Sequence, residues 1–266
     1  MSTANGRPPV VLAISGHDPT GAAGVQADIE AIARCGARCA SLVTALTAQN
    51  TTSFTAVFPQ PVAEMQRAAD ALLEDMPLSA CKVGLIGSWE VAEFVADVLD
   101  RIGPLPTVID PVLSAGTGTR IADDQTLRIY KQRLFARCTV VTPNCAEARL
   151  LGGSDDAGEA ARRICSMGAE NVLVTGGDED TPRVVNILYT ARGSEVRFDF
   201  ERIPGRFHGS GCTLAAALAA FLARGIEVEA AARLAQSYTH KALLKGCALG
   251  RGQQHPDRIQ AQPESP

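Results

Sequence analysis

Hydrophobic positions follow two patterns along this chain from residue 10 onward. Short apolar runs, typical of buried strands, lie at 10–14, 40–46, 82–86, 107–112, 139–142 and 171–174. Between these runs, apolar residues recur at helical spacing over 25–32, 61–75, 89–102, 123–135, 145–151 and 157–167. Strands that alternate with helices form a mainly parallel sheet with helices on both faces. The pattern therefore predicts an α/β fold.

The later part of the chain adds an antiparallel element. Residues 184–190 and 195–200 alternate between apolar and polar positions around 191–193, which predicts a β-hairpin. Two further helices are expected, one that opens at Gly211 and one over 229–245.

No internal repeat or low-complexity linker divides the chain, so we expect a single domain over residues 10–250. Residues 1–9 are polar and contain proline, and they are expected to form a flexible N-terminal arm. From Arg251 the chain is rich in glutamine, proline and charged residues, which predicts a disordered tail over 251–266.

Composition and charge indicate which kinds of binding partner to expect. The 266 residues are 46% hydrophobic and carry a formal net charge of −4. Such a chain lacks the basic surface that binds nucleic acid or anionic membranes, so we expect neither partner. No apolar run reaches transmembrane length and no leader peptide opens the chain, which favours a cytoplasmic protein. The eight cysteines include no Cys-x-x-Cys pair, as expected of free thiols in a reducing compartment.

Candidate site residues follow the predicted strands, because ligands of such sheets bind beyond the carboxyl ends of the strands. Small, polar and acidic residues stand there: Gly16, His17, Asp18, Gln49, Asn50, Gly84, Gly87, Asp110, Asn144, Glu147, Thr175, Gly176 and Gly177. Each has a structural alternative; Asn144 and Glu147, for example, have the spacing of a helix capping box. Taken together, Asp110 and Glu147 supply two carboxylates at one edge, as Mg²⁺ requires.

The sequence HGSGCT at 208–213 is the second candidate feature. Its glycines open directly into the Ala-rich apolar run 214–222, a predicted buried helix. The first turn of a helix has unpaired N–H groups and a partial positive charge, so this turn suits a phosphate group. The pKa of Cys212 is expected to fall in that field. The alternative interpretation is a glycine-rich entrance to a packed helix, with a buried cysteine.

Paired carboxylates and an anion-binding turn are the parts of phosphoryl transfer. The chain has no Gly-x-x-x-x-Gly-Lys-[Ser/Thr] sequence, which excludes a P-loop enzyme. Gly209 and Gly211 lack the third glycine of a dinucleotide-binding fingerprint, which argues against a Rossmann dehydrogenase.

Six stretches in family order resemble the hydroxymethylpyrimidine/phosphomethylpyrimidine kinases of the ribokinase-like superfamily. They are SGHDPTGAAGVQAD (15–28), TALTAQNT (44–51), KVG (82–84), DPV (110–112), TPNCAE (142–147) and HGSGCT (208–213). The resemblance implies a three-layer α/β/α sandwich and a small-molecule substrate. It also implies ATP- and Mg²⁺-dependent phosphorylation of 4-amino-5-hydroxymethyl-2-methylpyrimidine, its monophosphate or both, for thiamine biosynthesis. A homodimer is suggested on the same basis.

The resemblance also assigns roles to residues. The implied substrate pocket consists of Gly16, Asp18, Ala23, Gln49, Gly84, Leu85 and Val112, with Gln49 bonded to the aminopyrimidine ring. Asp110 and Glu147 match the positions that organise Mg²⁺. The implied ATP-binding residues are Asn144, Thr175, Gly177, Ser210 and Thr213. Gly209 and Gly211 match the anion hole, and Cys212 occupies the position of the catalytic base in sugar-kinase relatives.

Departures from the family pattern keep alternatives open. Thr175 and Gly116 stand where lysines are usual, His17 where serine is usual, and Asn186 where an acidic residue is often found. The basic residues available as replacements are Arg120, Arg206 and His208. One alternative function is a pyridoxal-type kinase, and another is a catalytically weak sensor of the pyrimidine. Two further questions stay open: whether Cys212 is a base or only lines the pocket, and whether residues 50–59 form a flap.

Overall fold

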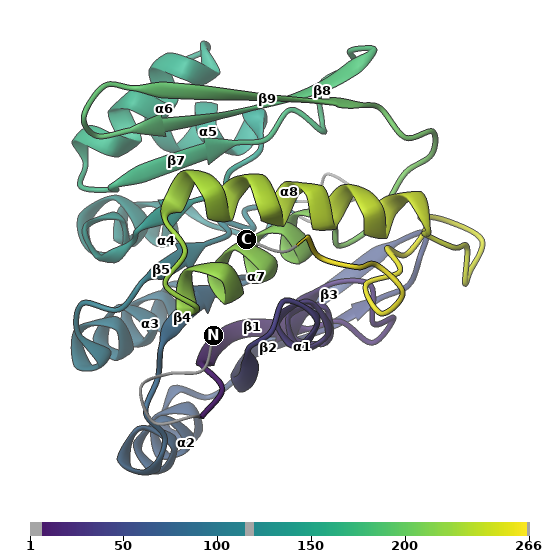
Figure 1. Ribbon diagram of the computed structural model, residues 1–266. Coiled ribbons are helices and arrows are strands. Elements are labelled where there is room, and N and C mark those ends of the chain that lie inside the picture. Colours follow the sequence, from purple (N-terminus) through teal and green to yellow (C-terminus); the bar gives the residue numbers. More distant parts are fainter. Residues whose placement is uncertain (1–6, 115–119, 265–266) are drawn as a thin grey trace.

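The computed structural model describes residues 7–114 and 120–264 (Figure 1). Within them, nine strands form one sheet in the order β3-β2-β1-β4-β5-β6-β7-β8-β9. The six parallel strands are β1 (Val10–His17), β2 (Arg38–Gln49), β4 (Ala80–Val83), β5 (Thr107–Ile109), β6 (Val140–Val141) and β7 (Asn171–Val174). This mainly parallel sheet confirms the predicted fold class.

Antiparallel strands close both edges of the sheet. The predicted hairpin is present as β8 (Arg183–Thr190) and β9 (Glu195–Glu201). The other edge carries β3 (Phe54–Pro59), antiparallel to β2, which the sequence analysis did not predict. The turn between β2 and β3 is held by Asn50, whose Oδ1 accepts hydrogen bonds from the backbone N–H groups of Thr52 and Ser53. Residues 50–59 are therefore the turn and second strand of a hairpin.

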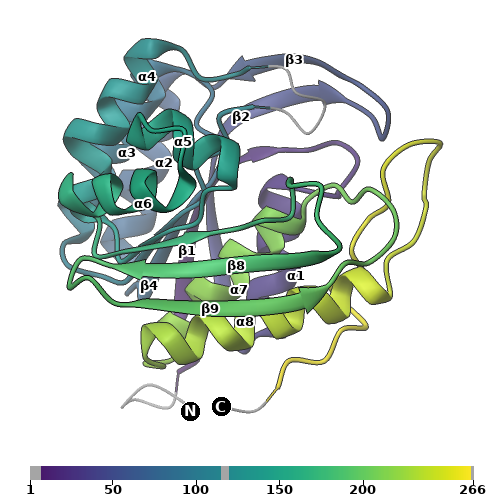
Figure 2. The same cartoon turned by 90° about the horizontal axis from the view of Figure 1, so that it is seen from above.

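Helices cover both faces of the sheet (Figures 1 and 2). One face carries α2 (Val62–Asp75), α3 (Trp89–Ile102), α4 (Asp124–Ile129), α5 (Cys145–Gly152) and α6 (Ala157–Ser166). The other face carries α1 (Gly24–Arg34), α7 (Ser210–Ala223) and α8 (Val228–Leu244). The helix expected over 123–135 is divided: α4 continues as a π-helical turn (Tyr130–Leu134) and a 3₁₀ turn (Phe135–Arg137).

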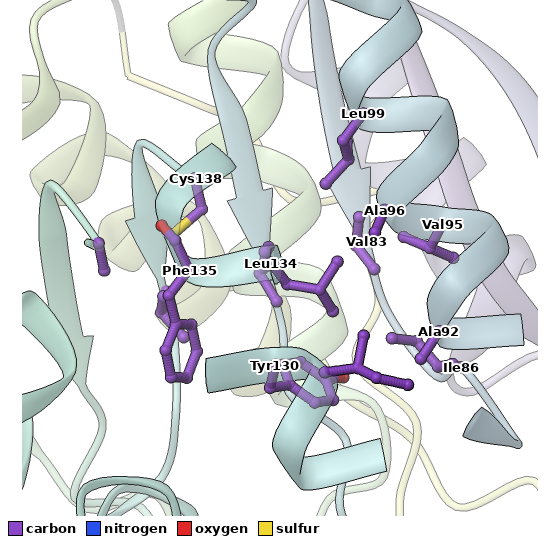
Figure 3. Packing of buried hydrophobic residues seen from close by; sticks show 14 of the residues in the cluster. Val83, Ile86, Ala92, Val95, Ala96, Leu99, Tyr130, Leu134, Phe135 and Cys138 are labelled. Atoms are coloured by element: carbon purple, nitrogen blue, oxygen red, sulfur yellow. The ribbon is translucent and has the colours of Figure 1, made fainter. Parts of the chain in front are cut away.

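The core is split by the sheet into two hydrophobic layers. Alternate residues of β1 enter opposite layers, with Leu12 and Ile14 on one side and Val11 and Ala13 on the other. In the first layer, side chains of α3 face those of Tyr130 and its neighbours (Figure 3). In the second layer, α7 is buried on nearly all sides between the sheet, α1 and α8. Its small alanines allow this close packing, and they fix the position of its N-terminus.

The chain after α8 corrects the expectation of a disordered tail for residues 251–264. His255, Arg258 and Ala261 are buried, and Tyr238 donates a hydrogen bond to the carbonyl of Arg258. Selected residues of this polar segment thus pack on the domain, while others are exposed. Residues 1–6 of the expected N-terminal arm lie outside the described residues, whereas the carbonyl of Pro9 accepts a hydrogen bond from Arg38. None of the described helices has the length and hydrophobicity needed to cross a bilayer.

Candidate active site

A cavity of about 880 Å³ opens at the carboxyl ends of the parallel strands. Its wall combines the segments that follow these strands with the first turn of α7. The predicted site residues in this wall are Gly16, Asp18, Ala23, Gln49, Leu85, Asp110, Val112, Asn144, Glu147, Thr175, Gly177, Gly209, Ser210, Gly211 and Cys212. Gly84 and Thr213 lie outside this wall, as do the candidates Asn50, Gly87 and Gly176. Segments far apart in the sequence thus share one cavity.

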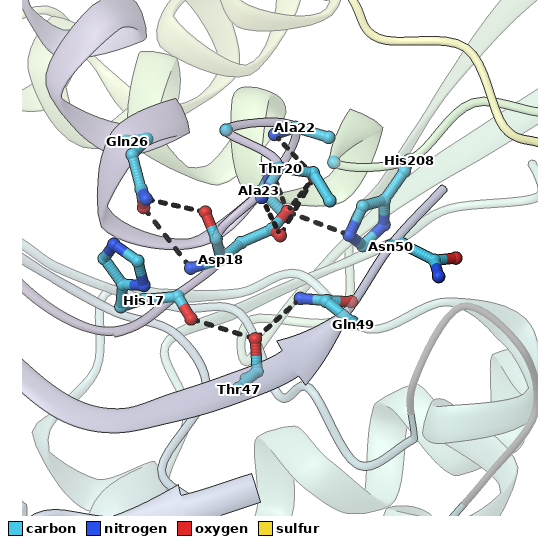
Figure 4. A network of polar contacts seen from close by, with 12 residues as sticks. His17, Asp18, Thr20, Ala22, Ala23, Gln26, Thr47, Gln49, Asn50 and His208 are labelled. Carbon is cyan, nitrogen blue, oxygen red and sulfur yellow. Dashed lines mark hydrogen bonds and ion pairs between the residues drawn. The ribbon is translucent and has the colours of Figure 1, made fainter. Parts of the chain in front are cut away.

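Asp18 organises the loop between β1 and α1 (Figure 4). Its carboxylate accepts hydrogen bonds from the backbone N–H groups of Thr20 and Ala23, both at 2.9 Å, and lies 3.1 Å from Nε2 of His208. Burial alone raises the pKa of Asp18, but His208 and the two N–H groups lower it to about 2. Asp18 is therefore a charged group whose oxygens are occupied within the chain, and it ties this loop to the segment before α7.

Gln49 lies at the end of β2 on the opposite side of the same loop (Figure 4). Its Nε2 donates to the Thr47 hydroxyl at 3.0 Å, and that hydroxyl donates to the carbonyl of His17 at 3.0 Å. This chain of bonds fixes the side-chain amide, with its Nε2 engaged by the protein. The Oε1 atom is then the end of the amide that is left to accept a hydrogen bond from a ligand.

A buried ion pair adjoins the cavity, whose lining includes Ser15 and Lys82, and sequence reasoning missed it. Lys82 is fully buried, and its Nζ lies 2.9 Å from Oδ1 of Asp28 and 3.0 Å from Oγ of Ser15. The Ser15 hydroxyl donates to Asp28 Oδ2 at 2.6 Å. Burial opposes the charge on Lys82, but Asp28 and, at longer range, Cys212 and Asp110 raise its pKa above the usual value. The available signal was a lysine inside an otherwise apolar strand run.

Gly84 provides the space for this ion pair. A Cβ at position 84 would lie 2.5 Å from Ser15 Oγ and 2.6 Å from Lys82 Nζ. The glycine therefore acts beneath the cavity, and its expected place in the substrate pocket is corrected to a supporting one.

Asp110 and Glu147 form the acidic part of the cavity. Asp110 is 6% exposed, and its Oδ2 has no hydrogen-bond partner among the described residues. Glu147 accepts hydrogen bonds from the backbone N–H groups of Asn144 and Leu113, and Asn144 caps α5 in return. The predicted capping box is therefore confirmed.

The electrostatics of this pair suit a cation. Burial raises the pKa of Glu147 to about 8, with the negative charge of Asp110 as the second cause. Burial likewise raises the pKa of Asp110, although Lys82 and a hydrogen bond with Cys212 oppose the shift. A buried carboxylate oxygen without a partner, beside a second acidic group, is a donor set that fits Mg²⁺.

The turn before α7 is built from glycine for a steric reason. Gly209 has φ of 83°, and a Cβ there would lie 1.8 Å from the carbonyl oxygen of Ala22. The backbone of this turn is therefore in direct contact with the backbone of the loop that Asp18 organises. Among the residues that the structure describes, no side chain caps the N-terminus of α7, so the N–H groups of Ser210 and Gly211 are available to an anion at the cavity wall.

Thr213 stabilises this turn from inside. Its side chain is fully buried, and both its hydroxyl and its N–H donate to the carbonyl of Gly209, at 2.7 and 2.9 Å. The structure thus gives Thr213 a place behind the anion-binding turn, where the sequence analysis expected a contact with ATP.

Cys212 corrects a sequence-based expectation. Its pKa is raised to about 12 by burial, with the nearby charge of Asp110 as the second cause, and Lys82 lowers it only in part. In return, Cys212 is one of the groups that lower the pKa of Asp110. Burial and a carboxylate therefore outweigh the field of the helix N-terminus, and both favour the thiol over the thiolate.

The basic residues near the cavity differ in whether their side chains are already bonded within the protein or are left to bind a phosphate. Lys82 is neutralised by Asp28, and Arg202 donates to backbone carbonyls, including those of Gly177 and Glu179. Arg206 lines the cavity, is exposed, and has no ion pair within the described part of the chain. The remaining two candidates are Arg120, which pairs with Asp124 away from the cavity wall, and His208, which pairs with Asp18. Gly116 lies outside the described residues.

Comparison with known proteins gives consistent matches. The family model "Phosphomethylpyrimidine kinase" matches residues 18–257. The chain is 38% identical over 253 residues to the hydroxymethylpyrimidine/phosphomethylpyrimidine kinase of Synechococcus elongatus, covering 92% of this chain and 95% of that protein. It is 35% identical over 265 residues to a probable chloroplastic thiamine biosynthetic bifunctional enzyme of Oryza sativa subsp. japonica. That match covers 93% of this chain and 47% of the rice enzyme, so the chain spans about half of the bifunctional protein.

Among solved structures, an ADP complex of Bacillus subtilis pyridoxal kinase superposes with a TM-score of 0.86 at 27% identity. The match covers 94% of this chain and 97% of that one. This likeness over nearly the whole chain agrees with the expected ribokinase-like architecture.

Proposed function

The chain belongs to the phosphomethylpyrimidine kinase family, and we propose that its cavity is the site of phosphoryl transfer from ATP to a hydroxymethylpyrimidine. The substrate is 4-amino-5-hydroxymethyl-2-methylpyrimidine, its monophosphate or both, and the product serves thiamine biosynthesis. One observation carries the proposal: the unpartnered Oδ2 of Asp110, the uncapped N-terminus of α7 and the fixed amide of Gln49 face one cavity.

Gln49 and its neighbours bind the pyrimidine in this proposal. The Oε1 atom of Gln49 accepts a hydrogen bond from the ring amino group, and the ring lies against the apolar side chains of Leu85 and Val112. A Cβ at Gly16 would lie 2.7 Å from Cδ2 of Leu85, so glycine at position 16 lets Leu85 sit close to the pocket wall.

Asp110 and Glu147 hold Mg²⁺ in this proposal, with Asp110 Oδ2 as the available oxygen. The ion, when bound, neutralises charge on the phosphate groups. The first turn of α7 then directs its N–H groups at the transferring phosphoryl group, where fixed dipoles stabilise the developing charge. Because its surroundings raise the pKa of the Cys212 thiol, we assign Cys212 to lining this site and not to a resident thiolate base.

The nucleotide side is formed by the ends of β6 and β7. Asn144 and Thr175 lie side by side there, joined by an isolated β-bridge. Gly176 donates its N–H to Oδ1 of Asn186, and no atom of residues 7–114 or 120–264 lies within 4 Å of the position of a Cβ on Gly177. This open backbone suits the close approach of a phosphate chain. ATP is the co-substrate in this proposal.

Arg206 lines the cavity without an ion pair among the described residues, and in this proposal it binds the nucleotide phosphates. We expect Arg206→Ala to raise KM for ATP about 10-fold or more, because a hydrogen bond to a charged group contributes about 1.5–3 kcal/mol. KM for the pyrimidine should change much less. Steady-state kinetics with each substrate varied in turn measure both values.

The matched control is Arg120→Ala, which removes an arginine that pairs with Asp124 and does not line the cavity. Its KM values should equal those of the unmodified protein. An Arg206→Ala enzyme with unchanged KM for ATP would refute the assignment.

The function itself is tested by ATP consumption with the pyrimidine, its monophosphate and pyridoxal, each with and without Mg²⁺. We expect Mg²⁺-dependent turnover of the pyrimidine or its monophosphate. Turnover of pyridoxal alone would favour the second candidate, which rests on the structural likeness to Bacillus subtilis pyridoxal kinase. Tight pyrimidine binding without turnover of any of the three would identify a sensor. The homodimer, the cytoplasmic location and the single-domain organisation stay predictions of the sequence.

A further inference from the structure

The segment after α8 is part of the wall that surrounds the active-site cavity. It leaves the end of α8, loops outward and returns along the same side of the molecule (Figures 1 and 2). The N–H of Gln253 donates to the carbonyl of Thr51 in the β2–β3 turn, and the carbonyl of Gln254 accepts from the N–H of His208. The segment thus connects the β2–β3 turn, next to Gln49, with the residues that lead into the first turn of α7.

Arg258 is the deepest polar anchor of this segment, at 3% exposed. Its guanidinium donates to the carbonyl of Gly21 at 2.7 Å, to the carbonyl of Ala22 at 2.9 Å and to Oε2 of Glu30 at 2.7 Å. A weaker contact of 3.4 Å reaches the hydroxyl of Thr213. All the strong donors of the side chain are therefore directed at the loop after β1 and at the helix that follows it.

The carbonyl of Ala22 connects this anchor to the anion-binding turn. It is the atom that a Cβ on Gly209 would approach to 1.8 Å, so Ala22 and Gly209 are in direct contact. The same loop holds Asp18, which fixes His208 on the other side of the turn. The position of the Gly209–Cys212 turn thus depends on a loop in which the carbonyls of Gly21 and Ala22 are both bonded to Arg258.

We propose that Arg258 is a positioning residue for phosphoryl transfer: it fixes the Gly21–Ala22 peptide against Gly209 and thereby sets the place of the α7 N–H groups relative to the substrate loop. The proposal rests on the kinase function given above. Arg258 touches no reacting atom in it. Its effect passes through the Ala22 carbonyl, and a displacement of that contact by about 1 Å is enough to lower the rate about 100-fold.

The test compares Arg258→Met and Arg258→Lys with the control Arg34→Met. Arg34 also anchors the C-terminal segment, through two hydrogen bonds to the carbonyl of Ala261 at 3.1 and 3.3 Å, but it does not contact the loop after β1. We expect Arg258→Met to lower kcat at least about 10-fold and to raise KM for the pyrimidine, with Arg258→Lys intermediate. Arg34→Met should lower Tm and leave kcat and both KM values unchanged.

Hydrogen–deuterium exchange provides a readout that is independent of turnover. Amides of residues 20–23 should exchange faster in both Arg258 variants and at the original rate in Arg34→Met. Unchanged exchange there, or kinetic constants that match those of Arg34→Met, would overturn the proposal. If Arg258→Met does not fold, the same two criteria apply to Arg258→Lys. Absence of turnover in the unmodified protein would count against the kinase function alone, because the exchange result still decides the role of Arg258.

Discussion

Replacing Gly209 by alanine is expected to lower kcat by about 100- to 1,000-fold, the cost of losing a well-placed anion-hole donor. The new Cβ would lie 1.8 Å from the carbonyl oxygen of Ala22, which is a backbone atom, and no side-chain rotation can separate the two. The turn or the loop must therefore shift by on the order of 1 Å, which moves the α7 N–H groups away from the phosphoryl group. Turnover with ATP and the pyrimidine measures the loss.

Gly225→Ala is the matched control, because it lies at the opposite end of the same helix. Gly225 has φ of 77°, close to that of Gly209, yet nothing lies within 4 Å of the position of its Cβ. Both variants incur the backbone cost of a left-handed alanine, about 1–2 kcal/mol of stability. Only Gly209→Ala should also lose activity. A Gly209→Ala enzyme with kcat near the original value would contradict the role assigned to the turn.

The arrangement of strands and helices was predictable because burial on both faces leaves an unmistakable pattern. A strand such as β1 is apolar on successive residues, and a helix such as α3 repeats its apolar positions every third or fourth residue. β3 escaped prediction because it is an edge strand whose residues are exposed or only partly buried, so it leaves no apolar run. The π-helical turn at Tyr130–Leu134 was not predicted, because the spacing of apolar residues shows only which face of a helix is buried. It does not show whether each N–H bonds to the carbonyl four or five residues earlier.

The site was predictable where the topology alone brings residues together. Asp110 and Glu147 follow neighbouring parallel strands, and such strand ends always meet at one edge. Side chains that depend on distant partners were missed. Arg258 bonds to carbonyls more than 230 residues earlier in the chain, and its segment has a composition that resembles disorder. The pKa of Cys212 was misjudged for the same reason, since the helix N-terminus is visible locally whereas burial and Asp110 are not.

Lys82 is the buried counter-ion of Asp28, a pairing that the sequence did not reveal. We expect Lys82→Met to be strongly destabilising. Methionine fills a similar volume but leaves Asp28 buried without its counter-ion, and breaking a buried pair in this way costs about 3–5 kcal/mol. The double variant Asp28→Asn, Lys82→Met removes both charges and should recover much of that loss. Urea denaturation of the three proteins measures the free energies of unfolding.

Lys241→Met is the control that shows whether the loss of stability in Lys82→Met comes from burial of the ion pair or from loss of a charge alone. Lys241 pairs with Glu264 at 2.8 Å, close to the 2.9 Å of the buried pair, but both side chains are more than a third exposed. Removing an exposed pair costs about 1 kcal/mol or less. If Lys82→Met lost no more stability than Lys241→Met, or if the double variant were less stable than Lys82→Met, the interpretation of Lys82 as the necessary counter-ion of Asp28 would fail. Gly84 would then need another explanation, because the space that it leaves is the space that this ion pair fills.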